Sequence, residues 1–510
     1  MRPLIGVVLA VLLAAVSVSG EIRQEALLEH IKFLASDDLR GRANGSEGLE
    51  RAADYVAAQF KAAGLEPAGR DGGWFQPFEL NAGLLVGREN TLTIEQGGKS
   101  VRVEIGKGYY PMAAPASDSP AQASTTFDDL PLVFAGYGLV VPSLGYDDYR
   151  GLDVAGKAVL IFSHEPQEQD PGSRLNGTRP VAQTTLQAKA AAARERGARA
   201  LIVIADPVHR ADDAPYALFA ADPDAEQLPI PVLRVRRDSL AAFIDGWQLD
   251  AAARLIDKDL VPRSRALPGV TVDYREHLAR NRRTVRNIVG VLRGSDPARA
   301  GEAVVIGAHY DHVGIGGRLS VTPDRTGEIH NGADDNASGT AAIIEMARTA
   351  AAERTRFPRT LIFVAFAGEE RGLLGSARYM TDPTVPAGNI VAMLNLDMVG
   401  RARGGVDISG LEVSPSMEAD LKAAVEVSKV GLSVHRQGPG AGRSDDSSFI
   451  DYRIPAVNFF TGFHDDYHAP GDDWQKIDAA GTRQVATLAL ELAAQLAARR
   501  DRPEFNAPRR

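Results

Sequence analysis

Short apolar runs alternate with amphipathic stretches over the second half of the chain. The runs have the length of buried strands, and the stretches between them repeat apolar residues at three- and four-residue steps, as one face of a helix does. The predicted strands are residues 285–292, 303–308, 361–367, 390–396, 406–409 and 457–460, and the predicted helices include 337–352, 418–429 and 479–499. This alternation predicts an α/β fold with a doubly wound, mostly parallel sheet that helices cover on both faces.

The first half of the chain has a different pattern. Two amphipathic helices are predicted at 21–34 and 47–63, and short hairpin strands at 91–95 and 100–105. A smaller, compact α+β unit is predicted over residues 127–265. Its evidence is a set of apolar runs at 130–135, 157–162, 200–205 and 230–235, with one helical stretch at 184–197. No tight grouping of ionisable residues stands out in this unit, so we assign it no chemistry.

The N-terminus has the pattern of a secretory signal peptide over residues 1–20. Arg2 precedes an uninterrupted apolar run at 4–16, and small residues follow at 18–20. The run is shorter than the ~20 apolar residues that span a membrane, although an uncleaved anchor is the alternative interpretation. We therefore expect a secreted or periplasmic protein with no membrane span once the signal has been removed.

Composition narrows the possible functions. With 510 residues the chain is long enough for two or more domains. Its formal net charge of −9, without a basic stripe, argues against nucleic acid as a partner. The chain has no cysteine, which excludes disulfides, thiolate metal ligands and a cysteine nucleophile.

Acidic and imidazole side chains directly follow three of the predicted strands. In the order of those strands they are His309, the pair Glu369 and Glu370, and Asp397. Because sites in open parallel sheets lie at the carboxyl ends of the strands, we expect these groups to meet at one edge of the sheet. Imidazole and carboxylate groups are ligands of divalent metal ions, and Asp311 is close enough in sequence to fix the tautomer of His309.

Two further candidates have ordinary structural explanations as well. Asp335 opens the predicted helix 337–352, where an acidic residue is a common helix cap, and His468 lies in a polar loop. Taken singly, each of the candidate residues is explained about as well by a structural role as by a metal. Their placement together is what favours a metal site.

The segments around these residues resemble the zinc aminopeptidases of family M28. The segments are 307–311, 332–339, 367–370, 395–400 and 466–468, and they occur in the order of that family. The middle unit resembles a protease-associated (PA) domain, which many M28 members carry as an insertion at this place. The resemblance implies a signal peptide (1–20), the N-terminal part of the catalytic domain (21–126), a PA-like inserted domain (127–265), the main metallopeptidase catalytic domain (266–500) and a tail (501–510).

The resemblance also implies a pair of metal sites. Asp335 would be the carboxylate that bridges two zinc ions, or other divalent ions such as Co²⁺ or Mn²⁺. His309 and Asp397 would complete one site, and Glu370 and His468 would complete the other. The family further implies a cis peptide bond after the bridging aspartate.

Three more residues receive roles from the same resemblance. Glu369 would be the general base, Asp311 the residue that orients His309, and Tyr467 a hydrogen-bond donor to the developing oxyanion. The expected reaction is the removal of N-terminal residues from peptides that have a free N-terminus, by a water that the metal site activates and Glu369 deprotonates.

Other interpretations of the sequence stay open. One is a glutaminyl cyclase-like enzyme that works with a single zinc, and another is a non-catalytic binding module on a peptidase fold. Residues 442–445 either help to bind substrate or form an Arg–Asp surface pair. The PA-like domain is expected to contact substrate or partner proteins.

Overall fold

The computed structural model of the protein describes residues 20–86, 89–113, 123–178, 181–209, 228–316, 319–322, 327–438 and 444–506. The predicted signal peptide lies outside these residues except for Gly20, and so do Gly442 and Arg443. Among the helices of the described residues, none is both long enough and apolar enough to cross a membrane.

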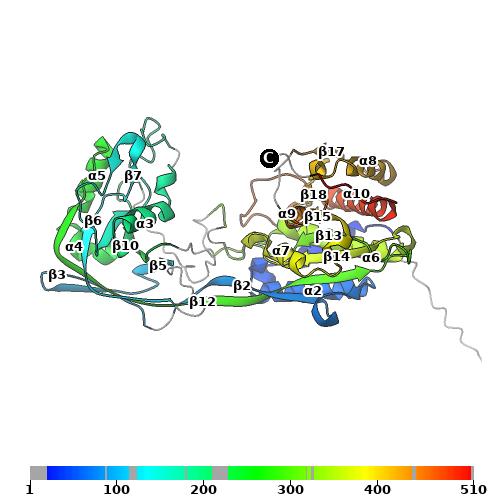
Figure 1. Ribbon diagram of the computed structural model, residues 1–510, viewed down its shortest axis with the longest axis horizontal. Helices are drawn as coiled ribbons and strands as arrows, with labels where there is room; N and C mark the ends of the chain where they lie inside the picture. Colours follow the sequence, from blue (N-terminus) through cyan, green and yellow to red (C-terminus); the bar gives the residue numbers. More distant parts are fainter. Residues whose placement is uncertain are drawn as a thin grey trace, which may run out of the picture. The chain divides into compact units, whose positions relative to one another are not determined.

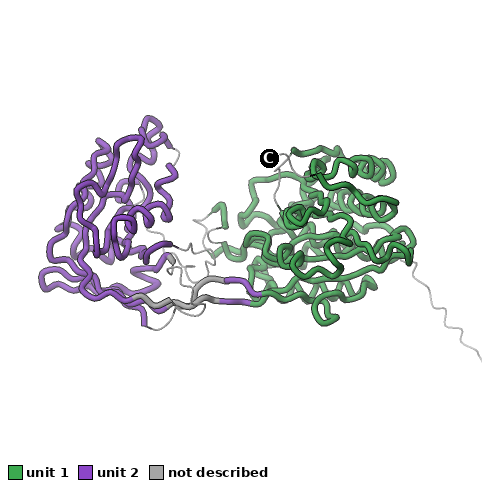
Figure 2. Tube along the Cα trace, in the orientation of Figure 1, with its two compact units in different colours: residues 1–78, 284–510 green, residues 79–283 purple. Residues whose placement is uncertain are grey.

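The chain forms two compact units (Figure 2). Unit 1 comprises residues 1–78 and 284–510, and unit 2 comprises residues 79–283. Unit 2 therefore extends beyond the predicted range 127–265. The reason is that strands expected to belong to the catalytic part pair within unit 2, where β3 (Thr91–Gln96) and β5 (Tyr109–Ala113) join its sheet.

Unit 1 contains most of the predicted elements. Its helices are α1 (Gln24–Leu34), α2 (Glu47–Ala62), α6 (Gly339–Ala352), α7 (Leu374–Thr381), α8 (Met417–Ser428), α9 (Asp446–Asp451) and α10 (Ala479–Ala498). Its strands are β1 (Glu66–Pro67), β13 (Ala303–His309), β14 (Thr360–Phe366), β15 (Ile390–Leu396), β16 (Gly405–Ser409), β17 (Ser433–Arg436), β18 (Ala456–Phe460) and the end of β12 (Arg265–Leu292). The side chain of Ser46 caps α2 and that of Asp478 caps α10, as expected for these residue types.

The sheet of unit 1 is mixed, with a parallel centre. The strand order is β17-β16-β18-β15-β13-β14-β12. The four strands β14, β13, β15 and β18 are parallel neighbours. Strand β16 runs antiparallel to β18 and parallel to β17, and β12 runs antiparallel to β14. Every residue of β13, β14 and β15 is buried, as in a sheet covered on both faces. This confirms the predicted α/β fold.

Helices pack on both faces of this sheet (Figure 1). The helices α1, α6 and α10 contact one another, and α6 and α10 contact β13. On the other face, α7 packs against α9, which contacts β15 and β18. Tyr379 of α7 and Phe449 of α9 share a core cluster with Val305, Val364 and Met393 of the central strands.

In unit 2 the strand order is β12-β6-β9-β10-β11-β5. Strand β12 is shared: one end pairs with β14 of unit 1, and the other end pairs with β6. Its further strands are β4 (Lys99–Val103), β6 (Ala123–Phe134), β7 (Val140–Val141), β8 (Tyr146–Asp147), β9 (Ala158–Phe162), β10 (Ala200–Ile204), β11 (Val232–Val235) and part of β2 (Phe75–Val86). Its helices are α3 (Leu186–Glu195), α4 (Ala241–Ile244) and α5 (Leu249–Asp259). The neighbours β6, β9, β10 and β11 are parallel. Core clusters lie on both faces of these strands.

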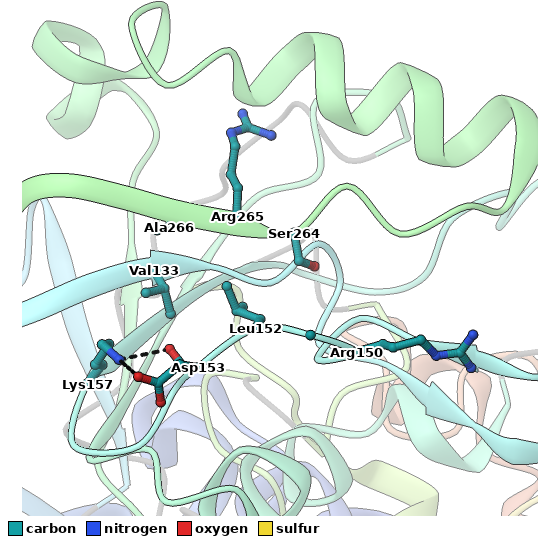
Figure 3. A pocket seen from close by; sticks show the side chains of 9 residues that line it. Val133, Arg150, Leu152, Asp153, Lys157, Ser264, Arg265 and Ala266 are labelled. Atoms are coloured by element: carbon teal, nitrogen blue, oxygen red, sulfur yellow. Dashed lines mark hydrogen bonds and ion pairs between the residues drawn. The ribbon is translucent and has the colours of Figure 1, made fainter.

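A pocket of about 380 Å³ lies in unit 2 (Figure 3). Arg150, Lys157 and Arg265 are among the side chains that line it. Lys157 Nζ lies 2.6 Å from an oxygen of Asp153, so this cation already has a partner. We assign no chemistry to this pocket.

Candidate metal centre

The carboxyl ends of the three central strands of unit 1 carry the predicted ligands. His309 is the last residue of β13, Asp397 follows β15, and Glu369 and Glu370 open a single helical turn shortly after β14. Because β14, β13 and β15 are parallel and adjacent, their carboxyl ends meet at the same edge of the sheet. The sequence prediction that these groups lie together therefore holds for their backbone positions.

Two groups of ligand atoms share one carboxylate. The first metal group consists of His309, Asp335 and Asp397, in which His309 Nε2 lies 3.3 Å from Asp335 Oδ1 and 3.3 Å from Asp397 Oδ1. Around the second position the possible ligands are Asp335, Glu370, His468 and His312. We call the first three the second metal group, in which His468 Nε2 lies 3.2 Å from Asp335 Oδ2 and 3.1 Å from Glu370 Oε2. Asp335 thus turns one oxygen towards each group.

These separations fit divalent metal ions. A tetrahedral zinc ion with bonds of about 2.0–2.1 Å places its ligand atoms about 3.3 Å apart. The four histidine–carboxylate distances lie between 3.1 and 3.3 Å, which is also the range of a long hydrogen bond. The donor set of imidazole nitrogens and carboxylate oxygens is also one that zinc prefers.

The electrostatics of the two groups call for positive charge. Burial lowers the pKa of His468, but the carboxylates of Glu370 and Asp335 outweigh it and raise that pKa to about 11. Burial likewise opposes protonation of His309, whereas Glu369 and Asp397 hold its pKa well above the usual value. Clustered carboxylates therefore require either protons or metal cations beside them.

Glu369 lies at the open side of the centre. Its side chain is 14% exposed and that of Asp397 is 16% exposed, against 1% for His309, so solvent reaches the site from this side. Glu369 Oε2 is 3.9 Å from His309 Nε2. Burial, together with the neighbouring carboxylates of Glu370, Asp397 and Asp445, raises the pKa of Glu369 well above its ordinary value, against the opposing effect of His309.

Asp311 connects the ends of β13 and β14. Its backbone carbonyl, 3.1 Å from His309 Nδ1, is the closer partner of that ring, since its carboxylate is 3.8 Å away. The carboxylate instead accepts the backbone N–H groups of Glu369 and Glu370 at 3.2 and 3.3 Å, and the side-chain amide of Asn44 at 2.6 Å. The backbone carbonyl of Asp311 thus contacts His309, whereas its carboxylate holds the backbone that carries the glutamate pair.

The turn that carries Asp335 is held by a buried aspartate. Asp472 Oδ2 accepts the backbone N–H groups of Asp334 and Asp335, both at 3.0 Å, while its other oxygen accepts a bond from Arg401 at 3.0 Å. The peptide bond between Asp335 and Asn336 is cis, as the family resemblance implies.

Tyr467 lies in a row of aromatic side chains beside the second metal group. Its ring stacks on the ring of His468, with centroids 4.0 Å apart, and meets Phe463 edge-on at 4.9 Å. Phe463 also contacts Phe460 and is 63% exposed, so an apolar surface lies next to the centre. Burial, and the carboxylates of Asp335 and Glu370, raise the pKa of Tyr467, which keeps its phenol protonated and able to donate.

A fully buried arginine that the sequence prediction missed lies beneath the centre. Arg42 donates to the backbone carbonyls of Leu34, Tyr310 (2.8 Å), Asn331 (2.8 Å) and Gly332 (3.0 Å). It thereby joins the loop after β13 to the loop that leads to Asp335. Nothing in the sequence marks this arginine, because its partners are backbone groups from distant segments.

Asp445 is not part of a surface pair. It is fully buried, and within the described part of the chain neither of its carboxyl oxygens has a hydrogen-bond partner. Burial raises its pKa to about 7, with Asp311 and Asp397 adding to the effect and His309 opposing it. The alternative of an Arg–Asp surface pair at 442–445 is therefore wrong for this aspartate.

His312 is a further residue at the centre that the sequence prediction left out. It follows Asp311 by one position, and its Nδ1 lies 2.8 Å from Glu370 Oε1 and 3.7 Å from Asp335 Oδ2. Its ring meets that of His468 edge-on, with centroids 5.4 Å apart. The sequence signal that could have identified His312 is its position: it is the third ionisable residue at the end of β13, after His309 and Asp311.

Comparison with known proteins agrees with this architecture. The family model of peptidase family M28 matches residues 287–493, which is the part of the chain that carries the two metal groups. In fold, the chain is similar to an aminopeptidase from Aneurinibacillus sp. strain AM-1 (22% identity, 97% of this chain and 98% of that one, TM-score 0.54). It is also similar to a zinc aminopeptidase from Bacillus subtilis (20% identity, 93% and 95%, TM-score 0.54).

Curated relatives match the chain over different lengths. A probable zinc metalloprotease of Pyrenophora tritici-repentis is 40% identical over 120 residues, which are 23% of this chain and 25% of that protein. Leucine aminopeptidase 1 of Trichophyton rubrum is 38% identical over 122 residues, 23% of this chain and 31% of that protein. The probable lipoprotein aminopeptidase LpqL of Mycobacterium tuberculosis is 25% identical over 474 residues, 88% and 76% of the two chains. The chain thus matches only about a quarter to a third of the two fungal proteins.

Proposed function

We propose that this protein is a metal-dependent aminopeptidase that holds two zinc ions, or other divalent ions, in the two metal groups. The observation that carries the proposal is the position of Asp335, whose two oxygens face His309 on one side and His468 on the other at 3.3 and 3.2 Å. A carboxylate shared in this way is the arrangement that a pair of neighbouring metal ions requires. The names of the relatives support the same activity.

Zinc ions bound there would supply a water of lowered pKa and a Lewis acid for the scissile carbonyl. Glu369 is the group that takes the proton from the attacking water and passes it to the leaving amine, because it is the exposed carboxylate that belongs to neither metal group. The phenol of Tyr467 donates to the developing oxyanion.

The acidic surroundings favour a substrate with a free N-terminus. Glu369 and Asp397 are the carboxylates exposed at the mouth of the centre, and an α-ammonium group would be attracted to them. The exposed ring of Phe463 offers an apolar surface to the side chain of the N-terminal residue. Exopeptidase action therefore suits the centre better than cleavage inside a chain.

The location of the protein and the role of unit 2 are part of the proposal. A secreted or periplasmic protein is supported by the signal-peptide pattern of residues 1–20 and by the lipoprotein named among the relatives. A PA-like domain is supported by the insertion of unit 2 between two parts of unit 1 and by its parallel core strands. Such a domain would contact substrate or partner proteins.

The experiment is a metal analysis combined with an assay on aminoacyl p-nitroanilides. We expect two zinc ions per chain and release of p-nitroaniline, which chelation abolishes and zinc restores. Glu369→Gln should keep both ions and lower kcat about 10²- to 10⁴-fold, since it removes only the general base. Glu353→Gln, a change at a half-buried glutamate paired with Arg356, is the control and should retain activity.

Other outcomes would contradict the proposal in distinguishable ways. Cyclisation of an N-terminal glutaminyl peptide with one zinc per chain would identify a glutaminyl cyclase-like enzyme. Zinc binding without hydrolysis of any aminoacyl amide would identify a non-catalytic binding module.

A further inference from the structure

We infer that His312 is a positioning residue, whose Nδ1–H group holds the carboxylate of Glu370 so that its other oxygen faces the second metal site. The inference rests on the proposed function, because it requires Glu370 to be a metal ligand. His312 is not one of the predicted ligands. In this arrangement one oxygen of Glu370 faces His468 and the metal position, and the other oxygen accepts from His312.

The two oxygens of Glu370 face different histidines. Oε2 lies 3.1 Å from His468 Nε2, a separation that suits two ligands of one metal ion. Oε1 lies 2.8 Å from His312 Nδ1, which is the length of a charge-assisted hydrogen bond. One oxygen is therefore directed to the metal position and the other is held by the protein.

The direction of this hydrogen bond follows from the chemistry of the pair. A carboxylate that binds a metal ion through one oxygen is ionised, so its other oxygen can only accept a hydrogen bond. Nδ1 of His312 must therefore carry the hydrogen. A carboxylate ligand that accepts such a bond loses its freedom to rotate away from the metal.

The distances argue against His312 as a ligand of its own. A fourth ligand atom in the second metal group would lie about 3.3 Å from each of the others. His312 Nδ1 instead lies 2.8 Å from Glu370 Oε1 and 3.7 Å from Asp335 Oδ2, too near to one and too far from the other. The opposite nitrogen, Nε2, is buried and has no hydrogen-bond partner in the described part of the chain.

The ring of His312 is fixed in place by the backbone around it. A Cβ atom at Gly332, where φ is +56°, would lie 2.5 Å from His312 Cδ2, so only glycine leaves room for the ring. The backbone N–H of His312 donates to the carbonyl of Arg42 at 3.2 Å. His312 is 1% exposed, so its ring is packed on all sides next to Glu370.

The test measures zinc affinity site by site. The full chain is stripped of metal and dialysed against zinc–nitrilotriacetate buffers of stepped free Zn²⁺, and bound zinc is counted by mass spectrometry. We expect the wild type to fill two sites. His312→Leu should fill one site as the wild type does and bind the other about 10- to 100-fold more weakly, as is typical when the partner of a metal ligand is lost.

A conservative variant separates positioning from packing. The amide of His312→Asn can place its N–H near the position of Nδ1, so this variant should recover most of the lost affinity. His30→Leu is the matched control, since His30 is also buried and hydrogen-bonded, through Nδ1 to the Tyr55 hydroxyl at 2.7 Å. It should leave both zinc affinities unchanged, and thermal unfolding of the metal-free variants shows whether each is folded.

Three results would overturn the inference. His312→Leu could bind both ions with wild-type affinity, His312→Asn could be as impaired as His312→Leu, or both sites could weaken equally. A wild-type chain that binds no zinc would instead refute the two-metal proposal on which the inference depends.

Discussion

Parallel strands end in buried acidic groups in both units of this protein, but among the described residues only unit 1 brings such groups together with histidines as possible metal ligands. In unit 1, β13, β14 and β15 lead to His309, Glu370 and Asp397, which belong to the two metal groups. In unit 2, β9 and β10 are also parallel neighbours, and Glu165 and Asp206 follow them. No third group of possible ligands occurs in the described residues of either unit.

Several acidic groups of unit 2 have partners within the protein, although Asp206 Oδ2 has no hydrogen-bond partner among the described residues. Asp148 accepts the backbone N–H groups of Tyr137 and Leu139, both at 3.0 Å, and the hydroxyl of Tyr146 at 2.9 Å. Lys189 supplies a buried cation beside these carboxylates and donates to two backbone carbonyls. Burial lowers the pKa of Lys189 to about 7 and raises that of Asp148 to about 7.

The difference shows what a strand-end position means. In unit 2 a lysine of the chain lies among the buried carboxylates. In unit 1 the carboxylates of the two metal groups face His309 and His468 instead of a lysine, and either protons on these rings or metal ions supply the compensating charge. The edge of a parallel sheet is therefore only a place where a site can form. In unit 1 the edge carries histidines that can exchange a proton for a metal ion, which a buried lysine does not do in unit 2.

The largest expected difference in zinc content and activity is between two variants, each with one aspartate replaced, one in each unit. Asp335→Asn removes the charge shared by both metal groups, so we expect loss of both zinc ions and a fall in kcat/KM on the order of 10³-fold or more. Asp206→Asn, at the matching place in unit 2, should leave zinc content and activity unchanged. Metal analysis and the p-nitroanilide assay on both variants measure this, and equal losses in the two would refute the distinction between the units.

Replacing Lys189, the buried lysine of unit 2, should destabilise unit 2 alone. Lys189→Met leaves buried carboxylates and two carbonyls without their partner, which is expected to lower the free energy of unfolding by about 3–5 kcal/mol. Urea unfolding followed by the fluorescence of Trp247 reports on this unit in a chain that carries Trp74→Phe and Trp474→Phe. Lys157→Met, at the solvent-exposed pair with Asp153, is the control and should barely move the midpoint.

The same Lys189→Met variant tests the independence of the two units. Its zinc content and kcat should equal those of the wild type under conditions in which unit 2 stays folded. Lower zinc affinity in the folded variant would show that the cation of unit 2 supports the metal centre as well.

The smallest expected effect is the release of protons when zinc binds. Carboxylates raise the pKa of His468 from 6.5 to about 11, so its ring is protonated at neutral pH when no metal is bound, whereas a zinc ligand must be neutral. Zinc binding at pH 7 should therefore release at least about one proton, measurable by calorimetry in buffers of different ionisation enthalpy. Zinc uptake without proton release would contradict the charge difference between the units.

The sign of the accompanying stability change follows from the same pKa. A histidine whose folded-state pKa is raised stabilises the folded chain fully below pH 6.5, and this contribution is lost as the pH rises towards 11. The metal-free protein should thus lose thermal stability between pH 7 and 10. The zinc-loaded protein should lose less, because its histidines are already neutral.

Much of unit 1 could be predicted from local sequence. The predicted strands 303–308, 361–367 and 390–396 coincide closely with β13, β14 and β15, since a strand buried on both faces is an unbroken apolar run. Strand β12 was underestimated at 285–292, because its full range Arg265–Leu292 includes charged residues between its two paired parts. Its length depends on pairing with β3 and β6 at one end and β14 at the other.

What the sequence by itself determined is the set of chemical groups and their order along β13, β14 and β15, because strand periodicity and the residue that follows each strand are local properties. Only the tertiary structure decided which groups act together. The hydrogen bond of His312 to Glu370, the burial of Asp445 and the carbonyl partners of Arg42 all join segments far apart in the chain. Such contacts depend on packing geometry, which leaves no pattern in the neighbouring residues.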